Sequence, residues 1–312
     1  MSASSSRSTT PAPRAARAGA PVPWRGVLFG VLSAVIWGIQ PIVSKISVAD
    51  GLTAADVTVL RFLAAGLVLL PMTLRAPVFP VGHLGWPRAI ALSALAGAPF
   101  SLALIGGFAF APALHSAVIG PALIPVVAML LGLVFLGERP RSAQLGAVTL
   151  VILGLLVFSF EALAGAPRRQ GAWRGDLLFA LAACMWAGFG FLAKRWQASP
   201  FAATAAISIL SLLSVPLWAF FMPLNILSAP LSASLLQALF QGVLVGVGAL
   251  YLYTRTVALL GPLQAALFVP LTPIVTAFAD LLYLGELPST AEVTGMIIVV
   301  SGMVLCIAAP RR

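Results

Sequence analysis

The sequence predicts an all-α integral membrane protein with about ten transmembrane helices in two inverted five-helix repeats. The composition, the length of the apolar runs and an internal duplication each predict part of this fold class. Of 312 residues, 61% are hydrophobic and only 8% are charged, and the mean hydropathy is +1.07. A chain of that composition cannot bury its apolar surface in a water-soluble globule, so we expect it in a lipid bilayer.

Apolar runs of about 17 to 23 residues alternate with short polar breaks, and helices of that length cross a hydrocarbon core of about 30 Å. In the first half we expect spans at 27–44, 57–74, 89–109, 116–136 and 144–160. In the second half we expect them at 177–193, 201–221, 235–257, 263–284 and 293–309.

The two halves repeat informative residues at a shift of about 148 to 149 positions. The matched positions are Trp37 with Trp186, Lys45 with Lys194, and Leu136-Gly137-Glu138 with Leu284-Gly285-Glu286. Ala, Leu and Val align with themselves by chance in such a chain, but Trp, Lys and the Leu-Gly-Glu turn do not. The sequence therefore contains an internal repeat.

Basic residues in the short connections predict the orientation, because Lys and Arg are retained on the cytoplasmic side. With the N-terminus inside, the basic residues of the loops and tails are cytoplasmic except for four, which are Lys45, Arg168, Arg169 and Arg174. We therefore expect both termini in the cytoplasm. Five spans per half then give the repeats opposite orientations, with the first Leu-Gly-Glu turn cytoplasmic and the second extracytoplasmic.

The predicted organisation has four parts. Residues 1–26, rich in Ser, Ala, Pro and Arg and without an acid, are expected to form a disordered cytoplasmic tail. The first repeat covers 27–160, an extracytoplasmic linker covers 161–175, and the second repeat covers 176–309. An organellar transit peptide has a composition similar to that of the tail and stays open as an alternative.

Several protein classes lack their diagnostic residues here. No Gly-Lys dipeptide occurs, so we expect no Walker A loop, no nucleotide and no other cofactor. His83 and His115 lie in no zinc motif and no Gly-x-Ser-x-Gly elbow occurs, so we expect neither a metal nor an enzyme. The net charge of +10 follows from cytoplasmic loops and not from a nucleic-acid-binding face. Cys184 and Cys306 are expected near opposite membrane faces, too far apart for a disulfide.

Three motifs resemble those of the EamA family in the drug/metabolite transporter (DMT) superfamily. They are Trp37-Gly38 followed by Lys45, then Leu60-Arg61-Phe62, then Pro125 followed by Leu136-Gly137-Glu138. Their order and duplication extend the resemblance over nearly the whole chain, from about Val27 to Ala309. The resemblance implies a ten-helix carrier of two inverted repeats in a bacterial inner membrane, exporting amino acids, other metabolites or drugs.

Arg61 and Asp280 are the ionisable residues expected well inside spans, where a charge costs about 2.5 to 3.5 kcal/mol even on mild insertion scales. Leu210 stands near the position where Arg61 would repeat, and Gly132 is the repeat partner of Asp280. Members of the family that the chain resembles usually have a small apolar residue at the position of Asp280. We hypothesise that Arg61 and Asp280 pair, or that Arg61 meets a substrate carboxylate while Asp280 meets an amine or a proton. A fixed ion pair that closes the outer face is the structural alternative.

Trp37 and Trp186 are expected near the middle of their spans, away from the interfacial belts where membrane tryptophans collect. There they can line a central cavity and offer apolar area and cation-π attraction to aromatic amino acids or flat organic cations. Packing between the repeats is the alternative, and the duplication of both tryptophans favours it.

Other polar residues in the spans should face the bundle interior, where they are candidate substrate contacts. They are Gln40, Ser116, Tyr251, Tyr253 and Gln264. His115 can sense pH, although a lone histidine at a membrane interface is usually a solvated side chain. Lys45 and Lys194 are interpreted as structural, through snorkelling and the negative helix C-terminus.

Prolines predict the moving parts, since a proline interrupts helical hydrogen bonding and lets a helix bend. Pro121 and Pro125 in the fourth span correspond to Pro270 and Pro273 in the ninth, and we interpret these four as candidate hinges of a gate. Prolines in transmembrane helices also occur without gating.

Two functions remain. The first is a secondary-active or facilitative carrier in the inner membrane, with a small-molecule substrate, the lipid bilayer and candidate protons as its partners. It would work by alternating access and export amino acids, with aromatic ones as a candidate class, or related metabolites, drugs or organic cations. The second is a non-transporting sensor or assembly partner with the carrier fold. A channel is disfavoured because inverted repeats suit alternating access better than a standing pore.

Overall fold

The computed structural model describes residues 23–75 and 84–308, and within those ranges every regular element is a helix. Most of the expected N-terminal tail, together with His83, lies outside the described residues. Helix formation begins three residues earlier than expected, at Trp24, because no residue from 24 to 36 is a proline and most are strongly apolar.

Seven α-helices lie in the described part of the first half. They are α1 (Trp24–Ala49), α2 (Ala54–Leu74), α3 (Trp86–Ala96), α4 (Ala98–Gly107), α5 (Ala113–Leu136), α6 (Ser142–Phe158) and the short α7 (Phe160–Leu163). Thr53 and Asp56 form a capping box at the start of α2, which fixes the turn after α1. Between α3 and α4, Gly97 interrupts the helical run where a Cβ would lie 2.4 Å from the Ser93 carbonyl oxygen.

The second half follows a 3-10 turn, η2 (Pro167–Arg169). Its α-helices are α8 (Ala172–Arg195), α9 (Pro200–Leu213), α10 (Val215–Phe221), α11 (Leu231–Gln237), α12 (Leu250–Leu260), α13 (Pro262–Ala266), α14 (Leu271–Ala279) and α15 (Thr290–Ala308). Two π-helical segments, η3 (Ala238–Ala249) and η4 (Asp280–Leu284), continue α11 and α14. The predicted linker is therefore partly helical, with α7 and η2 inside it.

Eight helical stretches of the described chain are long and apolar enough to cross a membrane. A ninth is reached if α9 and α10, which meet at an angle of 42°, count as one span. α6 is apolar but has only 17 residues. The protein is thus a multi-pass membrane protein, and the expected count of ten depends on including both α6 and the bent pair.

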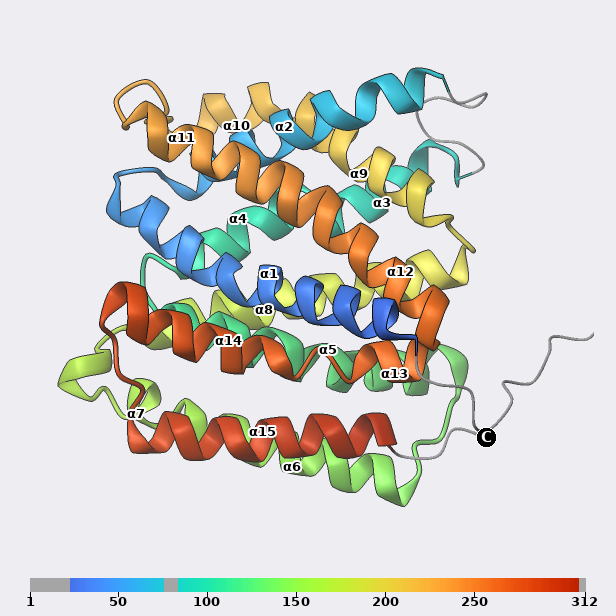
Figure 1. Cartoon of the computed structure of the whole chain (residues 1–312), viewed down its shortest axis with the longest axis vertical. Helices are drawn as coiled ribbons and strands as arrows, with labels where there is room; N and C mark the ends of the chain where they lie inside the picture. The colour runs from blue at the N-terminus through green and yellow to red at the C-terminus, as the bar shows by residue number, and fades with distance from the viewer. Residues whose placement is uncertain (1–22, 76–83, 309–312) are drawn as a thin grey trace, which may run out of the picture.

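The helices lie side by side, so their ends form two faces of the bundle (Figure 1). α1 begins and α15 ends at the same face, which we call the termini face. The opposite face carries the loops at 50–53, 108–112, 164–171 and 285–289. Large apolar side chains, such as Leu177 and Phe278, are exposed on the outside of the bundle, as expected for contact with lipid.

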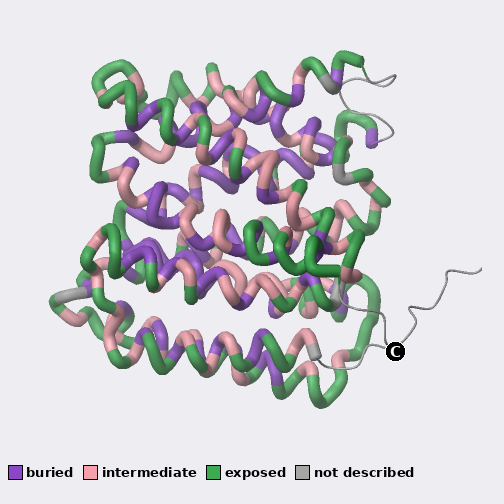
Figure 2. The backbone as a smooth tube through the Cα atoms, in the orientation of Figure 1, coloured by how far each residue is buried: buried purple, intermediate pink, exposed green. Residues whose placement is uncertain are grey.

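Helices of the two halves interlock. α1 packs against α12 and α14 of the second half, while α8 packs against α4 and α5 of the first half. α6 and α15 pack closely along one side of the bundle (Figures 1 and 2). Glycines permit this approach, since a Cβ on Gly295 would lie 2.3 Å from the Phe158 backbone nitrogen.

The four candidate hinge prolines act differently in the two halves. Pro121 and Pro125 lie inside α5, which continues through both without interruption. Pro270 is the N-cap of α14, and residues 267–270 between α13 and α14 form turns. The corresponding stretch of the second half is therefore broken at its proline, while a hinge role for the four residues stays a prediction.

Candidate functional site: a charged network at the opposite face

His115, in the first turn of α5, lies between two carboxylates from other helices. Its Nδ1 lies 2.6 Å from Asp176 Oδ1 on α8, and its Nε2 lies 3.0 Å from Glu292 Oε1 on α15. His115 and Glu292 are each only 1% exposed, and the ring edge of Phe158 closes over the imidazole. The expectation of a solvated interfacial histidine is therefore wrong, because three helices converge on this side chain.

Glu292 also binds Arg169 in a bidentate pair. Arg169 Nε donates to Oε1 at 2.7 Å and Nη2 donates to Oε2 at 3.0 Å. Ser289 and Glu292 form a capping box at the start of α15, with the Ser289 backbone N–H donating to Oε2 at 2.8 Å. Burial lowers the pKa of Arg169, but the hydrogen bonds and the charge of Glu292 outweigh it, so the net effect raises that pKa. Arg169 therefore stays cationic and fixes the linker to α15.

Asp280 caps a helix of the other half. The Leu114 backbone N–H, in the first turn of α5, donates to Asp280 Oδ2 at 3.2 Å, and Asp280 is 2% exposed. A carboxylate at a helix N-terminus is stabilised by unpaired N–H groups and by the helix dipole. Asp280 Oδ1 is buried without a hydrogen-bond partner. The interaction joins η4 to α5, and thus the second half to the first.

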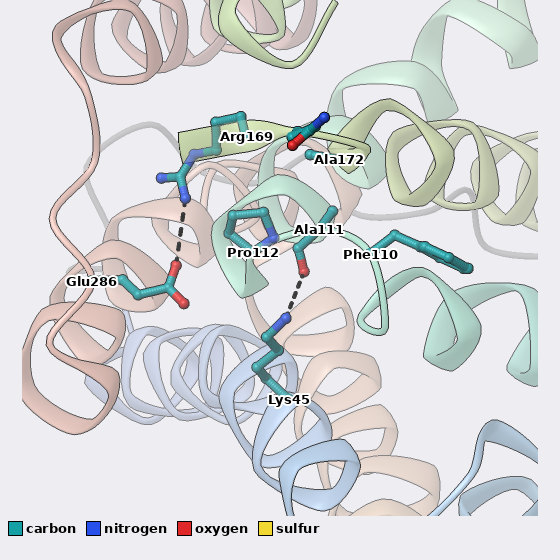
Figure 3. A pocket seen from close by; sticks show the side chains of 8 residues that line it. Lys45, Phe110, Ala111, Pro112, Arg169, Ala172 and Glu286 are labelled. Atoms are coloured by element: carbon teal, nitrogen blue, oxygen red, sulfur yellow. Dashed lines mark hydrogen bonds and ion pairs between the residues drawn. The ribbon is translucent and has the colours of Figure 1, made fainter. Parts of the chain in front are cut away.

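Lys45 completes the network from α1. Its Nζ donates to the Phe108 carbonyl oxygen at 2.8 Å and to that of Ala111 at 3.2 Å, just beyond the end of α4. It thereby stabilises the C-terminal end of a neighbouring helix. A small polar cavity of about 170 Å³ opens here, lined by Lys45, Phe110, Ala111, Pro112, Arg169, Gln170, Ala172 and Glu286. Figure 3 shows Arg169 pointing towards Glu286, whose Oε2 lies 3.7 Å from Arg169 Nη1, and Lys45 pointing towards the Ala111 carbonyl oxygen.

The network holds more negative than positive charge. Its four carboxylates are Asp176, Asp280, Glu286 and Glu292, and its permanent cations are Lys45 and Arg169. Two formal negative charges are thus left, and a proton on His115 leaves one. Within the described part of the chain, no group of three or more His, Cys, Asp or Glu side chains is arranged to hold a metal ion. The arrangement suits the binding and release of protons.

A polar seam runs between α1 and the π-helical segment η3. Gln40 Nε2 donates to Gln241 Oε1 at 3.3 Å, and Gln241 Nε2 donates to Ser44 Oγ at 2.7 Å. Gln237 Nε2 donates to the Val43 carbonyl oxygen at 2.9 Å. The expectation that Gln40 faces polar groups inside the bundle agrees with this geometry.

The two predicted tryptophans contact aromatic rings of the other half. Trp37 lies 5.2 Å from Tyr253 on α12, and Trp186 lies 5.2 Å from Phe100 on α4, measured between ring centroids. α1 with α12 and α8 with α4 are corresponding helix pairs of the two halves. The packing interpretation of the tryptophans thus has geometric support, and neither Trp37 nor Trp186 lines the polar cavity at the opposite face.

The remaining predicted site residues are dispersed. Arg61 and Asp280 do not contact each other. The Arg61 guanidinium lies 5.8 Å from the centre of the Phe62 ring and its Nη1 is buried without a partner, whereas Asp280 accepts from the Leu114 N–H. Ser116 Oγ donates to the Ala113 carbonyl oxygen of its own helix at 3.0 Å. Tyr251 and Gln264 are exposed, since they point away from the packed interior.

Sequence reasoning missed Asp176, Glu292, Arg169 and Glu286 as parts of one site. Asp176 and Glu292 were placed just before the spans 177–193 and 293–309, where an acid reads as a helix start. A signal was present, because the chain has only eight acids and all except Glu138 lie at helix ends or loops of the opposite face. A concentration of acids on one face indicates a site rather than a set of independent caps.

A bundle of apolar membrane-crossing helices with two interlocked halves defines a duplicated integral membrane protein. The sequence matches the EamA-like transporter family over residues 24–160 and 173–308, and the chain therefore belongs to this family, in the DMT superfamily. A solved structure described as "Crystal structure of protein" is similar in fold, with a TM-score of 0.59 and 20% sequence identity over 92% of this chain and 98% of that one. Comparison with curated proteins found no match.

Proposed function

We propose that the protein is a carrier that moves a small organic solute across the membrane by alternating access. The observation that carries this is the charged network, which joins α5 of the first half to α8, η4 and α15 of the second half at one face. A face that is closed by ion pairs between two halves can open when those pairs separate. The network thus acts as a closed gate of a two-state molecule.

The helix pairing supports ten spans in two inverted repeats. α1 contacts α14 as α8 contacts α5, and α1 contacts α12 as α8 contacts α4. α1 runs away from the termini face whereas α8 runs towards it (Figure 1). Corresponding helices that run in opposite directions and exchange partners are expected when a pseudo-two-fold axis lies in the membrane plane.

The charges support an orientation with both termini in the cytoplasm of a cell with an inner membrane. Basic residues at the termini face include Arg88, Arg139, Arg141, Lys194 and Arg195, while the acids gather at the opposite face. Retention of Lys and Arg on the cytoplasmic side then makes the charged network the extracytoplasmic gate.

The substrate class that we favour is an amino acid with an apolar or aromatic side chain. The Gln40–Gln241–Ser44 seam offers amide and hydroxyl groups, and the Trp37–Tyr253 pair beside it offers an aromatic surface. Buried amides of this kind can bind the polar ends of a small zwitterion when they exchange partners. Export rather than import follows the family analogy.

Flux into proteoliposomes tests the proposal. Purified protein is reconstituted and offered amino acids, organic cations and nucleosides under two pH gradients. Saturable flux of amino acids is expected, and it should be strongly reduced by Trp37→Ala and Gln40→Ala but unaffected by Tyr251→Phe at the exposed surface. Saturable flux of organic cations alone would replace the substrate class. Absence of flux for every solute would favour a non-transporting sensor or assembly partner.

Asp280→Asn separates a proton role from a capping role. The amide oxygen can still accept the Leu114 N–H, so the fold should persist while the charge is lost. Flux that keeps its magnitude and its response to pH in this variant would assign Asp280 to capping alone.

A further inference from the structure

The His115 ring has two nitrogens and two carboxylate neighbours. A neutral imidazole carries one N–H donor and one acceptor nitrogen, whereas an ionised carboxylate can only accept. With Asp176 Oδ1 at 2.6 Å and Glu292 Oε1 at 3.0 Å, both contacts are hydrogen bonds only if the trio holds one proton more than neutral His115 and two carboxylates. Without that proton, one nitrogen lone pair would face a carboxylate oxygen.

The neighbours of Glu292 locate this extra proton. Glu292 accepts two hydrogen bonds from Arg169 and one from the Ser289 backbone, which is the environment of an ionised carboxylate. Asp176 accepts from the ring at a distance typical of a charge-assisted bond. The extra proton therefore resides on His115, which bridges the two acids as an imidazolium.

We propose that His115, Asp176 and Glu292 form the proton-binding site of this carrier, and that the opposite face is closed only while the proton is bound. The proposal rests on the proposed function and names its coupling ion. Proton loss leaves a lone pair against a carboxylate, so α5 separates from α8 or α15. The polar cavity is lined by Arg169, which binds Glu292, so it approaches the trio from that face.

A second buried carboxylate, Asp280, lies at the same face, so the Asp176→Asn and His115→Gln variants described below are needed to assign a pH response to the trio. The other charged groups that face it are Arg169 and Glu161 of the linker, Lys45 of α1, Asp280 of η4 and Glu286 of the following loop. Arg169 is held cationic by its bidentate pair with Glu292, while Lys45 donates to two carbonyl oxygens. The Phe158 ring packs against the imidazole, which is only 1% exposed, so water does not solvate the ring while the face is closed.

Cysteine accessibility tests the site without any substrate. In protein lacking Cys184 and Cys306, Ala172→Cys places a thiol at a buried position that lines the cavity, and Gln170→Cys places one at an exposed position nearby. The rate of labelling by a membrane-impermeant thiosulfonate is measured in lipid nanodiscs from pH 5 to pH 8. The ratio removes the pH dependence that the two thiols share, and the variants described below, which carry the same two thiols, control for any difference in their titration.

The ratio should rise with pH, by up to about tenfold per pH unit for release of one proton. Two variants then separate a proton site from a structural contact. Asp176→Asn should give a low ratio at every pH, because an amide can donate to Nδ1 while a neutral ring donates from Nε2 to Glu292. His115→Gln should give a high ratio at every pH, since it removes the imidazolium.

Two outcomes would overturn the proposal: a ratio that does not change with pH, or an Asp176→Asn ratio that follows pH as the parent does. Flux measured in parallel keeps this separate from the proposed function. A pH-dependent ratio without flux of any solute would remove the carrier but keep the proton site. Flux with a constant ratio would do the reverse.

Discussion

At the termini face, Gly137 ends α5 with a φ of 66°, and at the opposite face Gly285 ends η4 with a φ of 64°. Both glycines adopt the left-handed conformation that a helix C-terminus favours, and a glutamate follows each. Glu138 is exposed, whereas Glu286 lies beside Arg169 at the polar cavity. One backbone turn is thus repeated while its chemical surroundings are not.

The same contrast holds at other repeat-related positions. Gln144 and Glu292 both complete capping boxes at the start of corresponding helices, but only Glu292 carries a charge and binds Arg169 and His115. Lys45 is bound to two carbonyl oxygens, whereas Lys194 is exposed. The repeated residues therefore share their helix geometry, while Arg169, Asp176 and Glu292, which have no charged counterpart in the repeat, give only one face a charged network.

The largest effect is expected for Glu292→Ala. This change leaves Arg169 and His115 without their shared partner and removes a helix cap, and breaking a buried ion pair costs about 3 to 5 kcal/mol. Thermal unfolding of the detergent-solubilised protein should show a large fall in Tm. Gln144→Ala is the matched control at the termini face, where loss of an exposed cap costs about 1 kcal/mol. Equal losses in the two variants would mean that both faces depend only on capping.

An intermediate effect is expected for Lys45→Met. The variant keeps the length of the side chain but removes the charged donor that bonds the end of α4, and a hydrogen bond to a charged group contributes about 1.5 to 3 kcal/mol. Lys194→Met, at an exposed position, should leave Tm almost unchanged. If the two substitutions lower Tm by the same amount, the contrast between the repeated lysines is lost.

The smallest effect is expected for Glu286→Gln. Its carboxylate is partly exposed and lies 3.7 Å from Arg169, and such a pair contributes about 0.2 to 1 kcal/mol. Raising the salt concentration should reduce the difference in Tm between this variant and the parent. The Tm difference between Glu138→Gln and the parent should not change with salt. A loss as large as that of Glu292→Ala would place the centre of the network at Glu286 instead.

Much of the fold follows from patterns of apolar length and repetition. Trp37 with Trp186 and the two Leu-Gly-Glu turns identify the duplication, because membrane spans tolerate few residue types and informative ones stand out. Interruptions were expected at the prolines of the fourth and ninth spans, and the chain breaks at Pro270 but continues as helix through Pro121 and Pro125. The bend between α9 and α10 was not foreseen.

The charged network was harder to predict, because it depends on which loops meet. Arg169 lies in the linker between the repeats, Asp176 lies in the second turn of α8 and Glu292 in the first turn of α15, so the three are far apart in sequence. Reasoning from burial cost singled out Asp280, which is buried, and offered a pair with Arg61 as one of two hypotheses because their depths were similar. Depth fixes one coordinate only, and the positions of α2 and η4 around the bundle decide against the pair.

The cap that Asp280 places on α5 has a consequence for biosynthesis. The Leu114 N–H in the first turn of α5 is made early in translation, while its carboxylate partner Asp280 is made near the end. Until η4 inserts, the start of α5 must find water or lipid headgroups instead. A ribosome-bound chain that ends before Asp280 is thus an inserted but unfinished bundle, and assembly of the first half is completed only by the last two spans.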